Sequence, residues 1–340
     1  MKPTKQDPID MSELHPEGVM DALRDMRRQV LESLVDDQTG CLKDDLAEDV
    51  PCYLCEAKDH EEELFFRDGF RFVRCKRCGL IYINPRVKDQ VIPSLYNDER
   101  YNFMARELLL KSAKYRQERL YRERLRYIAA YRPTPGTLLE VGSANGHFLD
   151  SARALGWNVT GVEINRFGCE YARDALGLDN IHNCDLLDAN FPSEAFDVVV
   201  MWDVLEHLPR PMATLCEVWR VLKLGGMVFI YVPNFDSVEV LFLSVHAPFF
   251  QGELHILYFT PATLQKMVEK ASFVTRHQET HGLDVEKILS VFGEEAWKVF
   301  GMYHTEARQF VKANINELQN VINRAGRGNN LRLFAEKPVE

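Results

Sequence analysis

Four cysteines are spaced like the ligands of a metal ion. Cys52 and Cys55 form one C-x2-C pair, and Cys75 and Cys78 form a second after nineteen intervening residues. Two such loops can complete a tetrahedral shell of four thiolates around zinc, with no position left for water, so we expect a structural zinc ion. The alternatives are four free thiols or a redox pair, and they are disfavoured because no thioredoxin-like unit surrounds the cysteines.

A glycine-rich loop is the second feature that could bind a ligand. The segment from Glu140 to Gly146 follows a short apolar run, but Ala144 and His147 replace two glycines of a dinucleotide-binding fingerprint, which disfavours NAD. A further acid, Glu163, ends the next predicted strand. Two carboxylates at strand ends suit a ligand with ribose hydroxyls and a cationic group but no pyrophosphate, and S-adenosylmethionine fits this description.

The elements that position this loop are an alternating series of strands and helices. The predicted strands are 138–141, 158–163, 196–201 and 227–232, and the predicted helices between them are 147–155, 167–176 and 212–222. Such alternation indicates a parallel sheet with helices on both faces, whose ligands bind at the carboxyl ends of the strands. We expect this domain to span 137–340, with a helical insertion at about 284–325 before a last strand at 331–335.

Three segments precede this domain. Residues 1–50 hold 6 Lys and Arg against 13 Asp and Glu, and their apolar residues between 19 and 34 recur at helical spacing. We expect that helix to pack on its own chain or to form a homodimer, with a substrate lid as the alternative. Residues 51–96, with short strands at 70–73 and 80–82, form the expected cysteine module.

A linking helix is expected within 97–136. Its residues 101–132 carry nine Lys and Arg and three Glu, interleaved with tyrosines. This pattern is compatible with a nucleic-acid or phosphate-binding face. We favour a solvated helix whose Tyr and Leu side chains face the core.

Five segments between residue 137 and about residue 275 form an ordered series: LLEVGSANGHFLD, NVTGVEIN, NCDLLD, FDVVVMWDVLEHLPRP and VLKLGGMVFIYVPN. In order and spacing they resemble the motifs of class I S-adenosylmethionine-dependent methyltransferases, which implies a Rossmann-like α/β fold. The resemblance implies that the glycine loop contacts the methionine part of the cofactor, that the acid ending the second strand holds the ribose, and that the aspartate of the third motif reaches the adenine. The cofactor-binding residues so implied are Glu140, Gly142, Ser143, Gly146, Glu163, Ile164, Asp185, Leu186 and Asp203.

The segments CYLC, RCKRCGLIYINPR and Tyr96–Tyr101 resemble a zinc-ribbon domain that precedes some sugar and natural-product methyltransferases. In that group a histidine after the fifth strand lies near the acceptor, which implies His255 here as the general base. Tyr258 is the expected helper and His207 the reserve; the alternative is that His255 only fixes a loop. The sugar enzymes have an acid directly before this histidine, whereas Leu254 stands there with Glu253 one step earlier, which argues against a deoxysugar.

Composition limits the partners. The net charge of -10, from 41 Lys and Arg against 51 Asp and Glu, makes nucleic acid an unfavoured partner. No apolar run is long enough for a membrane helix and no secretory signal is evident, so a cytoplasmic location is expected. The predicted reaction is methyl transfer to an oxygen, nitrogen or carbon of a small-molecule or glycan acceptor. The rivals are a methyltransferase acting on RNA or protein and a non-catalytic cofactor-binding module.

Overall fold

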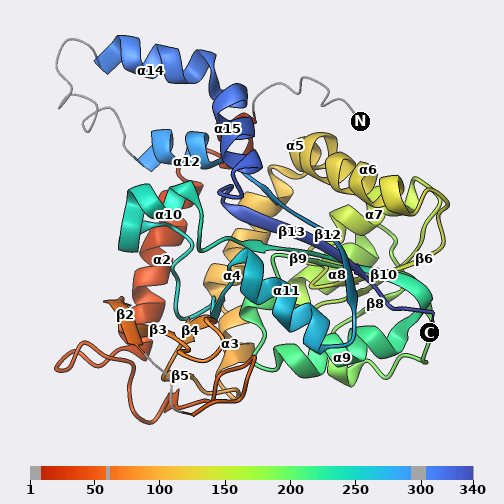
Figure 1. The fold of residues 1–340 in the computed structure, drawn as a ribbon, viewed down its shortest axis with the longest axis horizontal. Helices are drawn as coiled ribbons and strands as arrows, with labels where there is room; N and C mark the ends of the chain where they lie inside the picture. The colour runs from red at the N-terminus through yellow and green to blue at the C-terminus, as the bar shows by residue number, and fades with distance from the viewer. Residues whose placement is uncertain (1–8, 59–61, 292–303, 340) are drawn as a thin grey trace.

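The computed structural model describes residues 9–58, 62–291 and 304–339, and a seven-stranded sheet is its main element (Figure 1). The strand order is β12-β13-β10-β9-β6-β7-β8. Strands β10, β9, β6, β7 and β8 run parallel to one another, while β13 lies antiparallel between β10 and β12. The strand bounds are β6 Thr137–Val141, β7 Asn158–Val162, β8 Ile181–His182, β9 Phe196–Trp202, β10 Leu222–Pro233, β12 Val274–His281 and β13 Asn330–Glu336.

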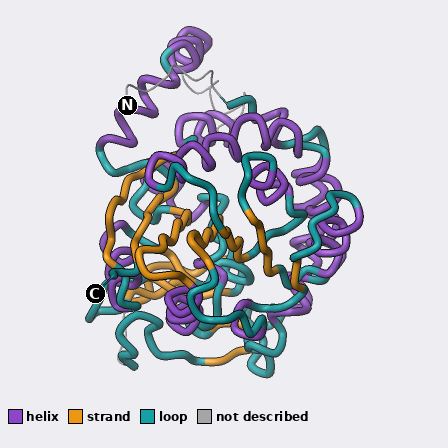
Figure 2. The backbone as a smooth tube through the Cα atoms, turned by 90° about the vertical axis from the view of Figure 1, so that its right-hand side faces the viewer, coloured by secondary structure: helices purple, strands orange, loops and turns teal. Residues whose placement is uncertain are grey.

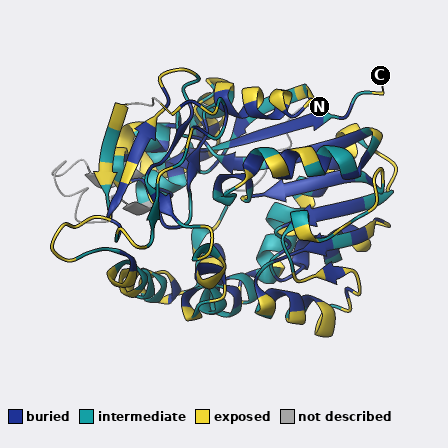
Figure 3. Cartoon of the chain, turned by 90° about the horizontal axis from the view of Figure 1, so that it is seen from below, coloured by how far each residue is buried: buried dark blue, intermediate teal, exposed yellow. Residues whose placement is uncertain are grey.

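Helices cover both faces of this sheet, as the sequence predicts. Side chains alternate along β9: Val198 and Val200 face one core cluster, and Val199 and Met201 face the other. The first cluster also contains residues of α6 (Arg122–Tyr131), α7 (His147–Arg153) and α8 (Arg166–Asp174), and the second contains residues of α9 (Pro211–Val221) and α11 (Pro261–Lys270). Figure 2 shows most of the strands surrounded by helices and loops, and Figure 3 shows several strands mainly in the colour of buried residues.

A smaller sheet includes the cysteine segment. Its order is β11-β4-β3-β2, formed by β2 (Glu62–Arg67), β3 (Phe70–Arg74), β4 (Ile81–Ile83) and β11 (Leu257–Tyr258). The β2–β3 turn has positive φ at both Asp68 and Gly69, as a tight hairpin requires. Because β11 comes from the segment after β10, a strand from the chain that follows the large sheet's β10 completes the sheet of the cysteine region. A separate two-stranded sheet is formed by β1 (Ala47–Glu48) and β5 (Arg86–Val87), which come before β2 and after β4 in the chain.

The amino-terminal helix α2 (Val19–Leu34) packs on its own chain, against the core cluster around the smaller sheet. Leu34 is buried in that cluster, and Val30 and Leu31 pack at its edge. It follows the short helix α1 (Met11–Leu14). A dimer through this helix stays a prediction.

The linking region is helical from Glu99 to Tyr131 with a break at Lys111 and Ser112. Its pieces are α4 (Glu99–Phe103), η1 (Met104–Leu110), α5 (Ala113–Arg116), η2 (Gln117–Tyr121) and α6, preceded by α3 (Ile92–Tyr96). Of the predicted helical insertion, the structure describes α12 (Asp284–Val291), α14 (His304–Ala313) and α15 (Ile315–Arg324), and 292–303 lie outside the described residues. The remaining short helices are η3 (Leu186–Asp188), η4 (Leu205–His207), α10 (Val238–Leu243) and η5 (Ser244–His246). In the described part of the chain, no helix is long and apolar enough to span a membrane.

Candidate active site

The glycine loop joins β6 to α7 at the carboxyl end of the parallel strands. Gly142 and Gly146 adopt φ of 73° and 77°, in the left-handed region that favours glycine. A Cβ on Gly142 would lie 2.6 Å from the side chain of Val204, so the loop approaches the segment after β9 closely. Ala144 also has positive φ, 45°, at the position where the resemblance leads one to expect glycine. The backbone keeps the glycine-type turn despite the alanine.

Glu163 follows β7 and is tied directly to this loop. Its Oε2 accepts a hydrogen bond from the Ala144 amide at 2.8 Å, and its Oε1 accepts one from the Asn165 amide at 2.7 Å. Burial raises the pKa of this carboxyl group, and the amide hydrogen bonds oppose that shift. Each carboxylate oxygen can accept a second hydrogen bond. Glu163 is therefore held in place with acceptor capacity left for ribose hydroxyls.

Asp185 follows β8, one strand further toward the sheet edge. Its Oδ1 accepts a hydrogen bond from the Leu187 amide at 2.9 Å and caps η3. Leu186 is buried, and the backbone oxygen of Ile164 accepts a hydrogen bond from Asn97 at 3.2 Å. The order β6-β7-β8 thus places the glycine loop, Glu163 and Asp185 in a row along the carboxyl ends of these three strands.

A cavity of about 140 Å³ lies at the glycine-loop end of that row, away from Asp185. It is lined by residues of the glycine loop, by residues that follow β9, and by residues of the linking helix: Leu109, Arg116, Leu120, Tyr121, Arg124, Glu140, Gly142, Ser143, Ala144, Asn145, His147, Phe148, Trp202 and Asp203. Glu140 Oε2 and Ser143 Oγ are buried without a hydrogen-bond partner. Burial raises the pKa of Glu140 to about 8. Unpaired polar atoms around a cavity fit a polar ligand such as the methionine part of S-adenosylmethionine.

Sequence reasoning missed Arg124, a residue of the linking helix that lines this cavity beside the predicted Asp203. Arg124 is 3.3 Å from Asp203, and its guanidinium lies over the rings of Trp202 and Tyr231 at 4.8 and 5.2 Å. The only hint in the sequence was the basic charge of the linking helix. The sequence alone does not show which acidic residue or ligand any one of its arginines contacts. In the structure that helix faces the cofactor domain.

His207 and His255 meet next to the same edge of the sheet. Their ring centroids are 4.5 Å apart, and the ligand atoms of Glu206, His207 and His255 all lie within 4.8 Å of one another. His207 Nδ1 is 3.1 Å from the backbone oxygen of Leu254, whereas His255 Nδ1 is buried without a partner. Burial lowers the pKa of His207 to about 4 and, with the neighbouring His207, lowers that of His255 well below 6.5. Both rings are therefore neutral near pH 7.

Tyr96 packs beside the histidine pair. Its ring centroid is 6.1 Å from that of His207, and its hydroxyl is buried without a partner. Burial raises the pKa of Tyr96, and the charges of Tyr101, Glu206 and Glu163 add to this effect. The charges of Glu163 and Glu206 thus both act on Tyr96.

Tyr258, the expected helper, lies in β11 with its ring centroid 6.4 Å from that of His255. Its ring packs against Phe72 and Phe250, at centroid distances of 5.1 and 5.4 Å. The hydroxyl is buried without a partner. The geometry brings Tyr258 near the histidine pair but anchors its ring in the core of the smaller sheet.

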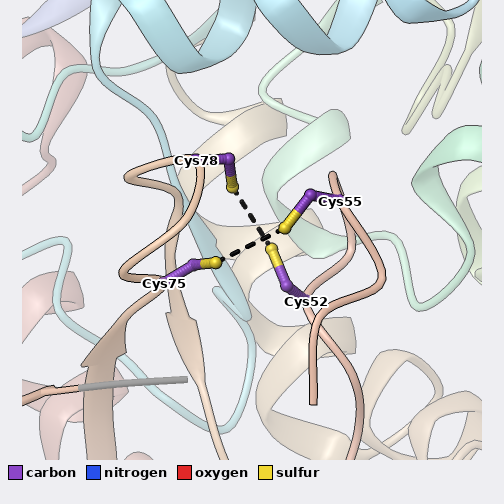
Figure 4. A group of neighbouring side chains, drawn as sticks. All are labelled: Cys52, Cys55, Cys75 and Cys78. Atoms are coloured by element: carbon purple, nitrogen blue, oxygen red, sulfur yellow. Dashed lines mark hydrogen bonds between the residues drawn. The ribbon is translucent and has the colours of Figure 1, made fainter. Parts of the chain in front are cut away.

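Cys52, Cys55, Cys75 and Cys78 converge on one point (Figure 4). The sulfur atoms of Cys52 and Cys78 are 3.4 Å apart, and those of Cys55 and Cys75 are 3.5 Å apart. Four ligands at the Zn–S bond length of about 2.3 Å have sulfur atoms about 3.8 Å apart in a tetrahedron. The four thiols fit a zinc ion with a small outward shift.

The two cysteine loops have the same local geometry. In each, the residue after the second cysteine has positive φ: Glu56 at 60° and Gly79 at 85°. The amide of that residue donates a hydrogen bond to the carbonyl of the first cysteine, at 2.8 Å in one loop and 2.9 Å in the other. This repeated turn directs both sulfur atoms of each pair to the same side.

Part of the chain that contains this site is similar to known proteins. Residues 112–278 match the family model described as a methyltransferase domain. Just under half of the chain is thus similar to a methyltransferase domain. Two bacterial relatives are both named ubiquinone biosynthesis O-methyltransferase. The one from Thiobacillus denitrificans is 27% identical over 186 residues, 51% of this chain and 79% of the relative, and the one from Paraburkholderia phytofirmans is 27% identical over 180 residues, 49% and 74% of the two chains.

Solved structures of other proteins also resemble this chain. A methyltransferase from Archaeoglobus fulgidus, described as dependent on S-adenosylmethionine, is 21% identical with a TM-score of 0.48, covering 71% of this chain and 100% of the neighbour. The family model begins within the linking helix and includes the glycine loop, Glu163, Asp185 and both histidines of the pair. The cysteine loops lie outside the matched residues.

Proposed function

We propose that this methyltransferase transfers the methyl group to a hydroxyl oxygen of a small molecule and that His255 accepts the proton of that hydroxyl. The observation that carries the proposal is a neutral, unpartnered imidazole nitrogen beside the cofactor residues at the carboxyl end of the sheet. The two relatives named O-methyltransferases support oxygen as the acceptor atom.

In this proposal the row of residues along the sheet edge holds the cofactor. Glu163 accepts hydrogen bonds from the ribose hydroxyls, Asp185 reaches the adenine with Leu186 beneath it, and the loop from Gly142 to Gly146 contacts the methionine part. Ser143, Ile164, Glu140 and Asp203 complete the set of binding residues. When bound, S-adenosylmethionine supplies a methyl group already activated by its sulfonium, so the protein must mainly position the acceptor and remove one proton.

His255 is the better base of the two histidines because its Nδ1 is free to accept. The Nδ1 of His207 is already held by the backbone oxygen of Leu254, the residue before His255. His207 thereby fixes the turn that carries the base, and it remains the reserve candidate. Burial keeps His255 unprotonated at neutral pH, which leaves the whole population able to accept a proton. Tyr258 is the proposed helper, through its unpartnered hydroxyl.

We further propose that the four cysteines hold a structural zinc ion. Burial would raise the pKa of the Cys75 thiol, but backbone hydrogen bonds at Cys78 and Arg77 bring it down to about 7. Burial raises the pKa of the Cys78 thiol to about 11 and raises that of Cys52 as well, so these two would need the charge of the metal ion to remain thiolates. Cys52, Leu80 and Tyr82 belong to the same core cluster as the face of the large sheet, so zinc would stabilise the cysteine region against the cofactor domain.

The test is the identity of the methylated product. The full chain is incubated with methyl-labelled S-adenosylmethionine and, in parallel, with small phenols and catechols, small amines, nucleotide-linked sugars, RNA and a mixture of peptides. We expect label on the oxygen of a hydroxylated small molecule, located by mass spectrometry. Label on nitrogen or carbon, on sugar, or only on RNA or peptide would contradict the proposal. Cofactor binding without label on any acceptor would instead favour a non-catalytic module.

A further inference from the structure

The cavity is lined by the positively charged Arg116, and Asp203, whose carboxylate acts on that charge, is already paired with Arg124. Arg116, at the end of α5, lines the cavity, and it forms no ion pair with any described residue. Arg124 is different because it is paired with Asp203. Burial lowers the pKa of Arg116, which reflects the cost of keeping a guanidinium in this environment. Such a charge is stabilised when an anion binds next to it.

The position of Arg116 is fixed by its own helix. Its Nε donates a hydrogen bond to Ser112 Oγ at 2.7 Å, and that hydroxyl donates to the backbone oxygen of Leu108 at 2.6 Å. Ser112 is 1% exposed. With Nε used in this way, the two terminal nitrogens of the guanidinium remain for a ligand, in the fork geometry that matches a carboxylate.

The topology of the sheet tells which part of the cofactor reaches Arg116. If Glu163 holds the ribose and Asp185 the adenine, the cofactor runs from β8 across β7, and its remaining part must continue toward β6 and β9. That direction leads into the cavity lined by the glycine loop, Trp202, Asp203 and Arg116. The only anionic group of S-adenosylmethionine is the carboxylate of its methionine part.

We propose that Arg116 binds the carboxylate of the methionine part of S-adenosylmethionine. The α-amino group of the same part is cationic, and the carboxyl groups of Glu140 and Asp203 line the same cavity. The cavity therefore offers partners of both signs to a zwitterion. This inference rests on the proposed cofactor position. It also explains why a basic helix lies on the cofactor domain: one of its arginines completes the cofactor site.

The experiment compares S-adenosylmethionine with its decarboxylated analogue, which lacks only the carboxylate. Dissociation constants are measured by calorimetry for the wild-type chain, for Arg116→Gln and for Arg126→Ala, an exposed arginine of α6 that serves as the control. We expect the wild type to bind S-adenosylmethionine about 10- to 100-fold more tightly than the analogue. Arg116→Gln should lose that preference while binding the analogue within about threefold of the wild type, and Arg126→Ala should keep it.

Three results would overturn the inference. The wild type could bind both compounds equally, Arg116→Gln could keep its preference for the carboxylate, or Arg116→Gln could weaken both compounds to the same extent. In each of these cases the wild type still binds S-adenosylmethionine, so the proposed function survives the failure of this inference. Absence of binding of either compound to the wild type would contradict the proposed function itself. The wild-type comparison needs no variant, so it remains decisive if Arg116→Gln does not fold.

Discussion

The imidazole rings of His207 and His255 meet edge to face, with their centroids 4.5 Å apart and their planes at 90°. His207 belongs to η4 after β9, and His255 belongs to the segment between β10 and β11. The pair therefore joins the cofactor domain to the segment that completes the smaller sheet. The side chain of Glu206 is buried beside it, with both carboxyl oxygens unpartnered, and burial raises the pKa of that group well above 4.5.

The half-buried histidine pair should make the fold sensitive to acid. The pKa of His207 is about 4 in the folded chain, against the ordinary value of 6.5. Between these two values the unfolded chain binds a proton that the folded chain does not, so the free energy of unfolding falls as the pH drops from 6.5 to 4. This residue alone accounts for up to about 3 kcal/mol of that fall. Denaturant unfolding at pH 7.5 and 5.0 should show a smaller difference in His207→Gln than in the wild type, whereas the exposed His182→Gln should match the wild type. An equal loss in all three proteins would contradict this account.

Removing zinc ligands should destabilise the cysteine region, which contains none of the proposed cofactor-binding residues. Metal analysis of protein purified without chelator should find about one zinc per chain. The double variant Cys75→Ser with Cys78→Ser should lose the metal and aggregate or melt at lower temperature. Cys216→Ser is the control, because Cys216 is exposed and far in sequence from both pairs. Zinc content that is unchanged in the double variant, or absent in the wild type, would be incompatible with the site.

Glu253 should be among the most important ionic residues for stability. Its side chain is fully buried, accepts two hydrogen bonds from Arg27 of α2 at 2.7 and 3.0 Å, and lies 3.2 Å from Arg100 of α4. Glu253→Ala leaves two arginines facing an uncharged site, which should cost about 3–5 kcal/mol in the free energy of unfolding. Asp21→Ala removes an exposed ion pair with Arg24 and should cost less than about 1 kcal/mol. Similar costs for the two variants would show that this buried cluster does not hold the amino-terminal helix in place.

Glu163 should carry a large share of cofactor affinity. Glu163→Ala removes the acceptor for the ribose hydroxyls, and we expect a loss of about 1.5–3 kcal/mol in binding of S-adenosylmethionine, as for hydrogen bonds to a charged group. Glu170→Ala on the exposed side of α8 is the control. Calorimetry measures both. Unchanged affinity in Glu163→Ala, or tighter binding of NAD than of S-adenosylmethionine by the wild type, would refute the assignment.

The large sheet could be predicted from sequence because its signals are local. The buried parallel strands β6, β7 and β9 are short apolar runs, and the loop after β6 is marked by glycines. The strand β12 could not be found in this way, since its sequence VTRHQETH is mostly polar and it lies at the sheet edge next to β13. β8 is only two residues long and gives no pattern.

The candidate site was predictable to the extent that its residues lie within motifs. The four cysteines form two C-x2-C pairs, and Glu163 ends the predicted strand that follows the glycine loop, so each could be recognised from the sequence around it. Arg116 comes from a separate helix, and only the fold brings it to the glycine loop. The same holds for the contact between His207 and His255, which depends on β11 pairing with β4.

The most direct test of the catalytic proposal is the turnover of His255→Gln. Once the acceptor is known, kcat and cofactor affinity are measured for the wild type, His255→Gln and His207→Gln. If His255 is the base, His255→Gln lowers kcat about 100-fold or more, since a positioned base contributes a factor of about 10² to 10⁴, and the affinity for S-adenosylmethionine stays nearly unchanged. If His255→Gln turns over within a few-fold of the wild type while His207→Gln is inactive, the base is His207 and the proposed order of the two histidines is wrong.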